Sequence, residues 1–339
     1  MKKDRTDGRG IVSGQASSDD IVCESGIRPL FLKDYIGQDR AKENLKIFID
    51  AALKRGEPLD HVLLSGSAGL GKTTLAGIIA GETGRDIRTT SGPAIERPID
   101  LVIILKGLHE GDVLFIDEIH RLRRPIEEIL YSAMEDFMLD RVINKGVGAR
   151  PVRIRLPKFT LVGATTRIGS LSSPLRARFG IILPLSFYDD AQLKDIVLRA
   201  AGILQVRISE DAALEIASRS RGTPRIANRM LRRIRDFADI KNGGVIDSET
   251  ARDAMKSLAV DRNGLDSVDR AILESMAFRF RGRPASLDSI AAAVSEEPEN
   301  IEEVYEPYLL KLGFIEKTSR GRQLLPAAYD YLGIDCGSL

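Results

Sequence analysis

A glycine-rich segment at residues 66–73, with the sequence GSAGLGKT, restricts the fold of this chain more than any other stretch. It matches the phosphate-loop pattern, which is a glycine, four variable residues and then Gly-Lys-Ser/Thr. The preceding residues 61–65 predict a short buried strand, and residues 73–82, rich in Ala, Leu and Ile, predict a helix. A strand, a glycine turn and a helix N-terminus are the context in which this pattern binds phosphate.

The residue types of this loop suit a phosphate ligand. Gly66, Gly69 and Gly71 lack a Cβ atom, so the backbone can curl until its N–H groups converge on one centre. The following helix adds the positive end of its dipole. We expect Lys72 to reach the β- and γ-phosphates of a nucleotide and the Thr73 hydroxyl to bind Mg²⁺. The alternative is an ordinary glycine turn that caps a helix.

Two acids follow a second apolar run. Residues 113–116 are Val-Leu-Phe-Ile, which predicts a buried parallel strand that ends at Asp117 and Glu118. Ligands of open α/β sheets lie at the carboxyl ends of strands, where these acids fall. We expect Asp117 to hold Mg²⁺, mostly through water, and Glu118 to polarise the attacking water. The alternative is a charged strand end that faces solvent, and His120 reads as a structural, hydrogen-bonded residue.

Candidate catalytic residues lie beside the last two predicted core strands. Residues 159–164 predict a strand that ends at Thr165-Thr166, and the Thr165 hydroxyl would sense the γ-phosphate, position water, or only cap the next turn. Arg176 and Arg178 precede the strand at 181–185. Arginine suits the charge of a transferred phosphoryl group, as a finger supplied by a neighbouring subunit, whereas composition alone favours a surface pair.

Residues 137–156 read as a β-hairpin inserted between two core strands. Two stretches of alternating character surround a Lys-Gly-Val-Gly turn. An excursion of this length inside a compact domain is usually functional, although a plain connecting loop is the alternative. If Val152 and Ile154 are exposed, they form a tip on which a partner docks.

From residue 189 the pattern is helical only. Helices are expected at about 189–202, 209–219, 224–240 and 247–258. Thr223 and Pro224 open the third of these helices, which puts Arg225 in its first turn. A cation is unfavourable there because of the helix dipole, so an anionic partner such as phosphate would compensate.

The C-terminal residues predict a winged helix. After a linker at 261–264 come helices at about 265–280, 286–294 and 300–312, and then a hairpin with a basic tip. Lys317, Arg320 and Arg322 on this wing would contact DNA phosphates without reading sequence. The alternatives are a solvated hairpin or a winged domain that binds protein.

Composition limits the remaining possibilities. A chain of 339 residues predicts two or three domains, and a net charge of +1 requires any DNA contact to come from a local patch. Cys23 and Cys336 lie near opposite ends and look incidental, which fits a cytoplasmic protein. No apolar run approaches a membrane span, and the first 20 residues lack the apolar region of a secretory signal.

Read together, these segments resemble the RuvB family, the bacterial Holliday-junction branch-migration motors of the AAA+ ATPase class. The resemblance runs from residue 27 to 333, and its specific carriers are residues 66–74, DVLFIDEIHRL at 112–122, FTLVGATTR at 159–167 and RGTPRIAN at 221–228. It implies an α/β P-loop AAA+ domain with a parallel sheet and helices on both faces, then an all-α lid and a C-terminal winged helix. The expected boundaries are a disordered leader at 1–26, the ATPase domain at 27–188, the lid at 189–260 and the winged helix at 261–335.

The resemblance also implies partners and a setting. It implies ATP, Mg²⁺ and a homohexameric ring around the duplex arms of four-way DNA junctions, in the cytoplasm, during recombination, DNA repair and the SOS response to DNA damage. RuvA is expected to dock on the hairpin bearing Val152 and Ile154, and RuvC to join the resolving complex. A rival hypothesis is a nucleotide-switched initiator or loader, which would lack the inserted hairpin; a scaffold with a vestigial site is a weak third.

Site residues carry over by position. Catalytic roles are implied for Lys72, Asp117, Glu118, Thr165, Arg176, Arg178 and Arg225, and metal binding for Thr73 and Asp117. Nucleotide contacts are implied for Ile27, Arg28, Gly66, Gly69, Leu70, Gly71, Lys72, Thr73, Thr74, Glu135, Asp136, Phe137, Tyr188 and Arg225. Lys317, Arg320 and Arg322 are the DNA contacts. Two departures are Ser67-Ala68 where Pro-Pro is usual, and Lys317 where Arg is usual, which keeps the charge but loses the bidentate fork.

Overall fold

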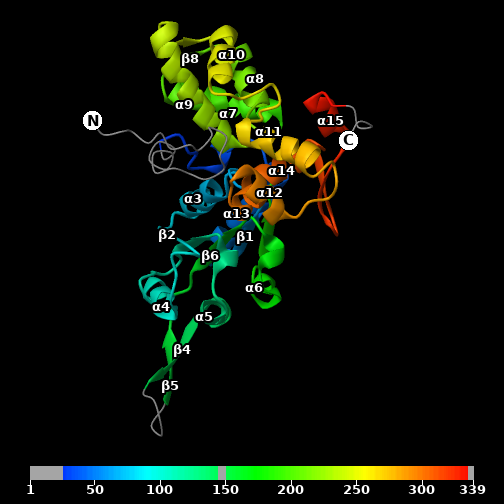
Figure 1. Ribbon diagram of the computed structural model, residues 1–339. Helices are drawn as coiled ribbons and strands as arrows, with labels where there is room; N and C mark the ends of the chain where they lie inside the picture. Colours follow the sequence, from blue (N-terminus) through cyan, green and yellow to red (C-terminus); the bar gives the residue numbers. More distant parts are fainter. Residues whose placement is uncertain (1–25, 144–149, 335–339) are drawn as a thin grey trace, which may run out of the picture. The chain divides into compact units, whose positions relative to one another are not determined.

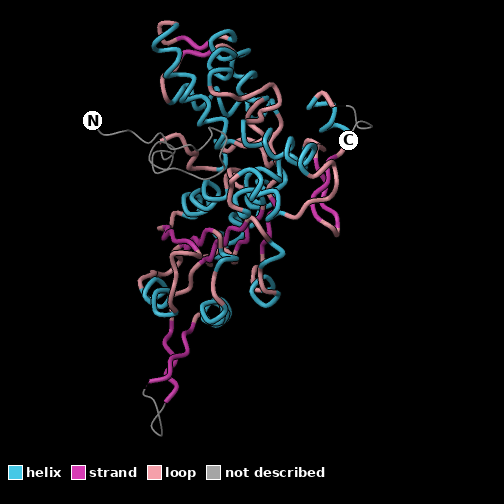
Figure 2. Tube along the Cα trace, viewed as in Figure 1, coloured by secondary structure: helices cyan, strands magenta, loops and turns pink. Residues whose placement is uncertain are grey.

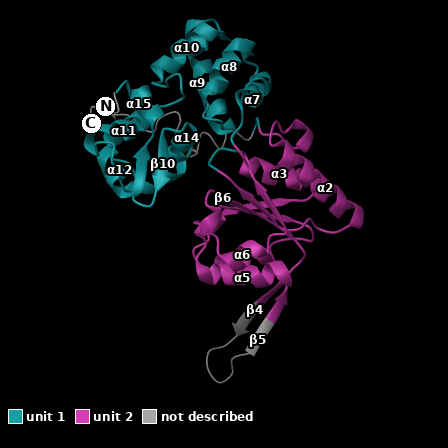
Figure 3. Cartoon of the chain, turned by 90° about the vertical axis from the view of Figure 1, so that its right-hand side faces the viewer, with its two compact units in different colours: residues 1–27, 67–70, 187–339 teal, residues 28–66, 71–186 magenta. Residues whose placement is uncertain are grey.

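The chain divides into two compact units, which Figure 3 shows in different colours. The structure is a computed structural model that describes residues 26–143 and 150–334. We call residues 28–66 and 71–186 the sheet unit. The helical unit comprises residue 27, residues 67–70 and the described residues from 187 onward. The predicted leader therefore lies outside the described residues, except for residue 26.

A five-stranded parallel sheet organises the sheet unit. Its strand order is β2-β3-β6-β1-β7, and the strands span Ile87–Ser91 (β2), Val113–Asp117 (β3), Thr160–Thr165 (β6), Val62–Ser65 (β1) and Ile181–Pro184 (β7). Nearly every residue of the three inner strands is buried. Helices cover both faces of a parallel sheet, so successive side chains do not alternate between core and solvent. The predicted α/β fold is confirmed.

Helices lie on both sides of this sheet. Helices α2 (Asp39–Arg55) and α3 (Lys72–Thr83) lie on one side in Figure 3, and α5 (Arg124–Glu135) and α6 (Ser173–Ala177) lie on the other. Leu63, Leu114 and Leu161 of the sheet share one apolar cluster with Leu130 of α5 and Leu175 of α6. Helix α4 (Pro98–Lys106) contributes to the same cluster, and neither α4 nor the edge strand β2 was predicted from the sequence.

The inserted hairpin is present and projects from the sheet unit (Figure 1). Strands β4 (Met138–Ile143) and β5 (Arg150–Arg155) pair antiparallel, with Leu139 opposite Ile154. Ile154 is partly buried and packs against the main apolar cluster of the unit, so it belongs to the base of the hairpin and not to an exposed tip. The Val152 side chain and the turn at 144–149 lie outside the described residues. The docking role of this hairpin stays a prediction.

Four helices form the first part of the helical unit, as predicted. They are α7 (Asp190–Ile203), α8 (Glu210–Ser218), α9 (Pro224–Lys241) and α10 (Ser248–Ser257). The expectation of helices alone was wrong in one detail. Two short parallel strands, β8 (Arg207–Ile208) and β9 (Val245–Ile246), tie the ends of the helices together and are visible in Figure 2. Two residues are too few to show a periodic pattern in the sequence.

The C-terminal part of the helical unit is the predicted winged helix. Its helices include α11 (Ser267–Glu274), α12 (Leu287–Val294), the short α13 (Pro298–Asn300) and α14 (Glu306–Lys311), with π-helical turns at Ser275–Arg279 and Ile301–Tyr305. The wing pairs β10 (Ile315–Thr318) with β11 (Gly321–Leu324). A further helix, α15 (Pro326–Leu332), was not predicted. No helix within residues 26–143 and 150–334 has both the length and the apolar character of a membrane crossing.

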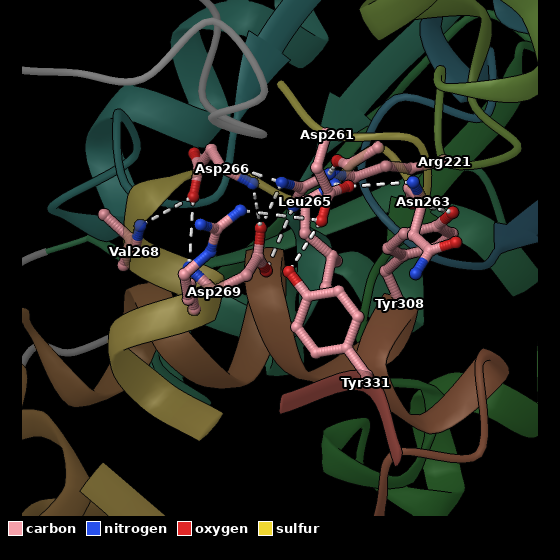
Figure 4. A network of polar contacts seen from close by, with 11 residues as sticks. Arg221, Asp261, Asn263, Leu265, Asp266, Val268, Asp269, Tyr308 and Tyr331 are labelled. Carbon is pink, nitrogen blue, oxygen red and sulfur yellow. Dashed lines mark hydrogen bonds and ion pairs between the residues drawn. The ribbon is translucent and has the colours of Figure 1, made fainter. Parts of the chain in front are cut away.

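A buried ion pair joins the lid helices to the winged helix (Figure 4). Arg221, just before α9, is only 2% exposed and donates from Nε to the Gly264 carbonyl at 2.8 Å. Both of its Nη atoms contact the carboxylate of Asp269 in α11, which is fully buried. The Tyr308 ring of α14 lies 5.5 Å from the guanidinium carbon. The two parts of this unit are therefore held together by a desolvated charge pair.

Candidate functional site

The phosphate loop has the backbone that its glycines predict. Gly66, Gly69 and Gly71 have φ values of 143°, 83° and 95°, which L-residues with a Cβ rarely adopt. The loop leads from β1 into α3, whose N-cap residue, Gly71, has no side chain to cap the helix. An anion bound in the loop would meet the N–H groups at the start of α3 and the positive end of the helix dipole.

Lys72 closes over this loop. It is the first residue of α3, its side chain is 7% exposed, and its Nζ donates to the Gly66 carbonyl at 2.7 Å. Thr73 and Thr74 follow it and are half-buried. A phosphate bound in the loop would offer the ammonium a stronger, charged acceptor than a neutral carbonyl.

The acids lie at the same edge of the sheet as the loop. Strand β6 lies between β1 and β3, so the carboxyl ends of all three strands meet there. Glu118 adopts a left-handed φ of 46°, and its backbone N–H donates to Asp117 Oδ1 at 3.0 Å. Burial alone would raise the pKa of Glu118, but His120, Lys72 and Thr166 together lower that pKa below its ordinary value. Glu118 is therefore ionised at neutral pH.

Thr166 and His120 contact Glu118, and Thr165 contacts His120. Thr166 Oγ1 donates to Glu118 Oε2 at 3.2 Å, and His120 Nδ1 lies 3.2 Å from the same oxygen. Thr165 is fully buried, and its hydroxyl lies 3.0 Å from His120 Nδ1. Sequence reasoning singled out Thr165 and treated His120 as structural. The contact between His120 and Glu118 lies within the 3₁₀ turn Ile119–Arg121, which Glu118 precedes and which the sequence did not predict.

The helical unit holds the middle of the phosphate loop. The Arg225 N–H donates to the Gly69 carbonyl at 3.4 Å, and the Tyr188 hydroxyl donates to the Leu70 carbonyl at 3.4 Å. Ile27, another predicted nucleotide contact, is buried, and its carbonyl accepts a hydrogen bond from Arg199 of α7 at 2.7 Å. Leu70, Tyr188 and Arg225, predicted as nucleotide contacts, thus meet around residues 67–70, whereas Arg28 belongs to the sheet unit.

Gly69→Ala is expected to weaken nucleotide binding, because φ is 83° there and a Cβ would lie 3.2 Å from Arg225 Cβ. The left-handed backbone alone costs an alanine about 1–2 kcal/mol, which is roughly a tenfold loss of affinity. Calorimetric titration with ATP measures it. The control is Gly77→Ala within α3, where a Cβ meets no heavy atom of the described chain within 4 Å. That change should stabilise the helix by about 0.5–1 kcal/mol, and equal affinity losses in both variants would contradict the role of Gly69.

The two candidate finger arginines differ in their surroundings. Arg176, on α6, is exposed. Arg178, just after α6, is partly buried and forms an ion pair of 2.9 Å with Glu135 at the end of α5. Asp136 is exposed and Phe137 packs edge-on against the Phe159 ring at 5.8 Å. Of the predicted nucleotide contacts at 135–137, Glu135 therefore touches the candidate finger.

The wing's cations are unequal. Glu306 of α14 is 1% exposed, and its carboxylate pairs with Lys317 Nζ at 2.5 Å and with Arg322 Nη2 at 3.0 Å. Arg320, in the turn between β10 and β11, is exposed. Two of the three predicted DNA contacts therefore already face an internal carboxylate, and Arg320 is the one at the tip.

Three family models of known proteins together match nearly all of residues 27–333. Residues 27–185 match the family model of the Holliday junction DNA helicase RuvB P-loop domain, residues 188–261 the RuvB AAA lid domain, and residues 262–333 the RuvB C-terminal winged-helix domain. The solved structure titled Thermotoga maritima RuvB Holliday junction branch migration motor is 47% identical, with a TM-score of 0.84. The match covers 91% of this chain and 99% of that one. A point mutant of the same protein is 48% identical, with a TM-score of 0.85 over the same shares.

Proposed function

This chain belongs to the RuvB family of Holliday junction DNA helicases, and we propose that it is an ATP-driven motor that moves the branch point of four-way DNA junctions. The observation that carries the proposal is the strand order, because neighbouring parallel strands bring the loop before Lys72 and the acids at the end of β3 to the same edge of the sheet. An ammonium for the phosphates and an ionised carboxylate for the attacking water are the two charges that hydrolysis of ATP requires there.

Each residue of this edge has a defined task in the proposal. Lys72 leaves the Gly66 carbonyl and pairs with the β- and γ-phosphates of ATP. Glu118, kept ionised by its neighbours, orients and polarises the attacking water, and Thr166 holds one of its oxygens. Arg225, at the N-terminal turn of α9, gives the lid a cation that nucleotide attracts.

Thr73 and Asp117 are the residues that would hold Mg²⁺. Hydroxyl and carboxylate oxygens are donors that this ion accepts. Within residues 26–143 and 150–334 no cluster of three or more His, Cys, Asp or Glu could hold a metal by itself. Such a sparse donor set fits Mg²⁺, which keeps several waters and takes its other ligands from substrate phosphates. When bound, the ion supplies positive charge to the transferred phosphoryl group.

The larger assembly belongs to the same proposal. Arg178, with Arg176 nearby, would act as a finger on the nucleotide of a neighbouring subunit in a homohexameric ring around duplex DNA. The chain would divide into an ATPase domain at 27–188, a lid at 189–260 and a winged helix at 261–335. RuvA and RuvC would be its partners at the junction, in cytoplasmic recombination and DNA repair.

A labelled four-way junction tests the proposed function. The protein, ATP, Mg²⁺ and RuvA are mixed with the junction, and conversion to duplex arms is followed; Lys72→Ala is the control. ATP-dependent conversion that is lost in the control would support the motor. Binding and hydrolysis of ATP without movement of the junction would favour a nucleotide-switched loader instead.

Val152→Glu is expected to abolish stimulation by RuvA while basal ATP hydrolysis stays within about twofold, because a charge opposes burial of an apolar hairpin residue in an interface. The hairpin is an excursion of β4 and β5 away from the five-stranded sheet that carries the acids. ATPase assays with and without RuvA give the ratio. Full stimulation of the variant would contradict the docking role.

Arg320→Ala is expected to weaken duplex binding and to lower the slope of log affinity against log salt by about 1, since one phosphate contact is lost. Arg322→Ala should change the slope less, because Glu306 already neutralises part of that charge. Fluorescence anisotropy with a labelled duplex over a series of salt concentrations measures both slopes. Equal reductions in the two variants would contradict the distinction drawn from Glu306.

A further inference from the structure

Arg178 is held on three sides by its own subunit. Its Nη2 pairs with Glu135 at 2.9 Å, and its Nη1 donates to the Pro174 carbonyl at 2.8 Å. The guanidinium carbon lies 4.5 Å from the centroid of the Tyr131 ring. One face and both ends of the planar fork are thus oriented by α5 and by the start of α6.

The Tyr131 side chain is held in place by hydrogen bonds of its hydroxyl group. Its hydroxyl donates to Glu127 Oε2 at 2.9 Å and lies 3.0 Å from Ser172 Oγ, and Ser172 donates to the same carboxylate oxygen at 2.6 Å. Glu127 is buried. Glu127, Tyr131 and Glu135 recur every four residues, so they form one stripe along α5. The stripe connects a buried carboxylate to the arginine.

The contacts of Arg178 contribute little to the folding stability of the protein. The Glu135 side chain is 56% exposed, and ion pairs of that exposure contribute little to folding. The Nε–H of Arg178 is buried without an acceptor among the described residues, which is unfavourable. What the contacts do achieve is orientation, because a guanidinium is planar and directional and a small misplacement of it is costly in catalysis.

We propose that Glu135 and Tyr131 are positioning residues that aim Arg178 at the nucleotide of the neighbouring subunit. This rests on the proposed function, in which Arg178 acts across a subunit interface. The family resemblance placed Glu135 among the nucleotide contacts, but its ion pair with Arg178 assigns it here to the finger instead. Loss of Glu135 is therefore expected to impair the neighbour's site and to leave the subunit's own site intact. The same logic makes the aromatic ring of Tyr131 matter more than its hydroxyl, since the ring faces the guanidinium.

Glu135→Gln is the first variant. It keeps the shape of the side chain and removes the charge that holds Nη2. We expect kcat for ATP to fall by about tenfold to a hundredfold and KM to stay within about twofold. Glu128→Gln is the matched control, because Glu128 lies on the same helix, is 63% exposed and lies 3.8 Å from Arg124. Tyr131→Ala should resemble Glu135→Gln, and Tyr131→Phe should lose less.

Mixed rings separate positioning from a purely structural role. Glu135→Gln subunits have an intact nucleotide site, whereas Lys72→Ala subunits have an inactive site and an intact finger. Mixing the two before ring assembly should restore ATP hydrolysis well above the sum of the separate proteins. Normal kcat of Glu135→Gln alone, increased kcat, or no gain on mixing would each overturn the inference.

A parallel mixture identifies which hypothesis fails. Arg178→Ala with Lys72→Ala should also regain activity if the finger acts between subunits. Gain in this mixture without gain for Glu135→Gln would reject the positioning role and leave the proposed function standing. No gain in either mixture would reject the finger acting across the interface, and the inference would fall with it.

Discussion

Glu118→Gln is expected to leave ATP binding intact and to reduce ATP turnover by about 10²–10⁴-fold, the usual contribution of a general base. The glutamine keeps a hydrogen-bond acceptor for Thr166, which donates to Glu118 at 3.2 Å, so the local structure should persist. It loses the negative charge that polarises water. His120 and Lys72, which now keep the pKa of Glu118 low, cannot restore that charge.

Single-turnover hydrolysis and equilibrium binding of ATP together check this prediction. The rate should fall while the dissociation constant stays within a few-fold of the parent protein. Glu128→Gln, an exposed glutamate on α5, is the control for the loss of one negative charge. A variant that hydrolyses ATP at the parent rate would remove Glu118 from the reaction.

Arg221→Met is expected to destabilise the helical unit by about 3–5 kcal/mol, because it leaves a buried carboxylate without its partner. Asp269 is fully buried, and Asp266, 4% exposed at its side chain, lies 3.9 Å from the same guanidinium. Removal of the arginine would leave two desolvated acids beside each other. The neutral double variant Arg221→Met with Asp269→Leu should recover most of the loss, since it removes the uncompensated charge.

Amide hydrogen exchange of α11 measures this effect within the full chain, because it reports the free energy of local opening. Arg252→Met is the matched control: Arg252 is 58% exposed and lies 3.6 Å from Glu215. The control should change the opening free energy by less than about 0.5 kcal/mol. Similar values for Arg221→Met and Arg252→Met would show that the buried pair is not what joins α11 to the lid helices.

Elements with strong local signals were predictable from the sequence. The inner strands β1, β3 and β6 carry continuous apolar runs because they are buried on both faces, and α9 begins with a Thr-Pro pair. Strand β2 was missed because it lies at the edge of the sheet, and the first three of its five residues are exposed. An edge strand has little apolar surface to hide, so its sequence resembles that of a loop.

The site was predictable only in its linear part. Lys72, Thr73, Asp117 and Glu118 follow from spacing, because each stands directly after a strand or at the start of a helix. Their supporting contacts do not. Arg178 meets Glu135 across 43 residues, and Arg322 meets Glu306 across 16, through tertiary contacts that no local pattern encodes. The sequence predicts the candidate reacting groups, and the tertiary structure shows which side chains contact them.

A motor that travels along a duplex must release each phosphate as readily as it grips it. Lys317 and Arg322 share the carboxylate of Glu306. In the proposed function, a phosphate that binds them competes with an anion that the protein already carries. When the phosphate departs, that carboxylate is in place to return, and the two cations need not wait for solvent ions. We therefore expect the wing, in the proposed function, to bind the DNA backbone weakly and to detach from it quickly.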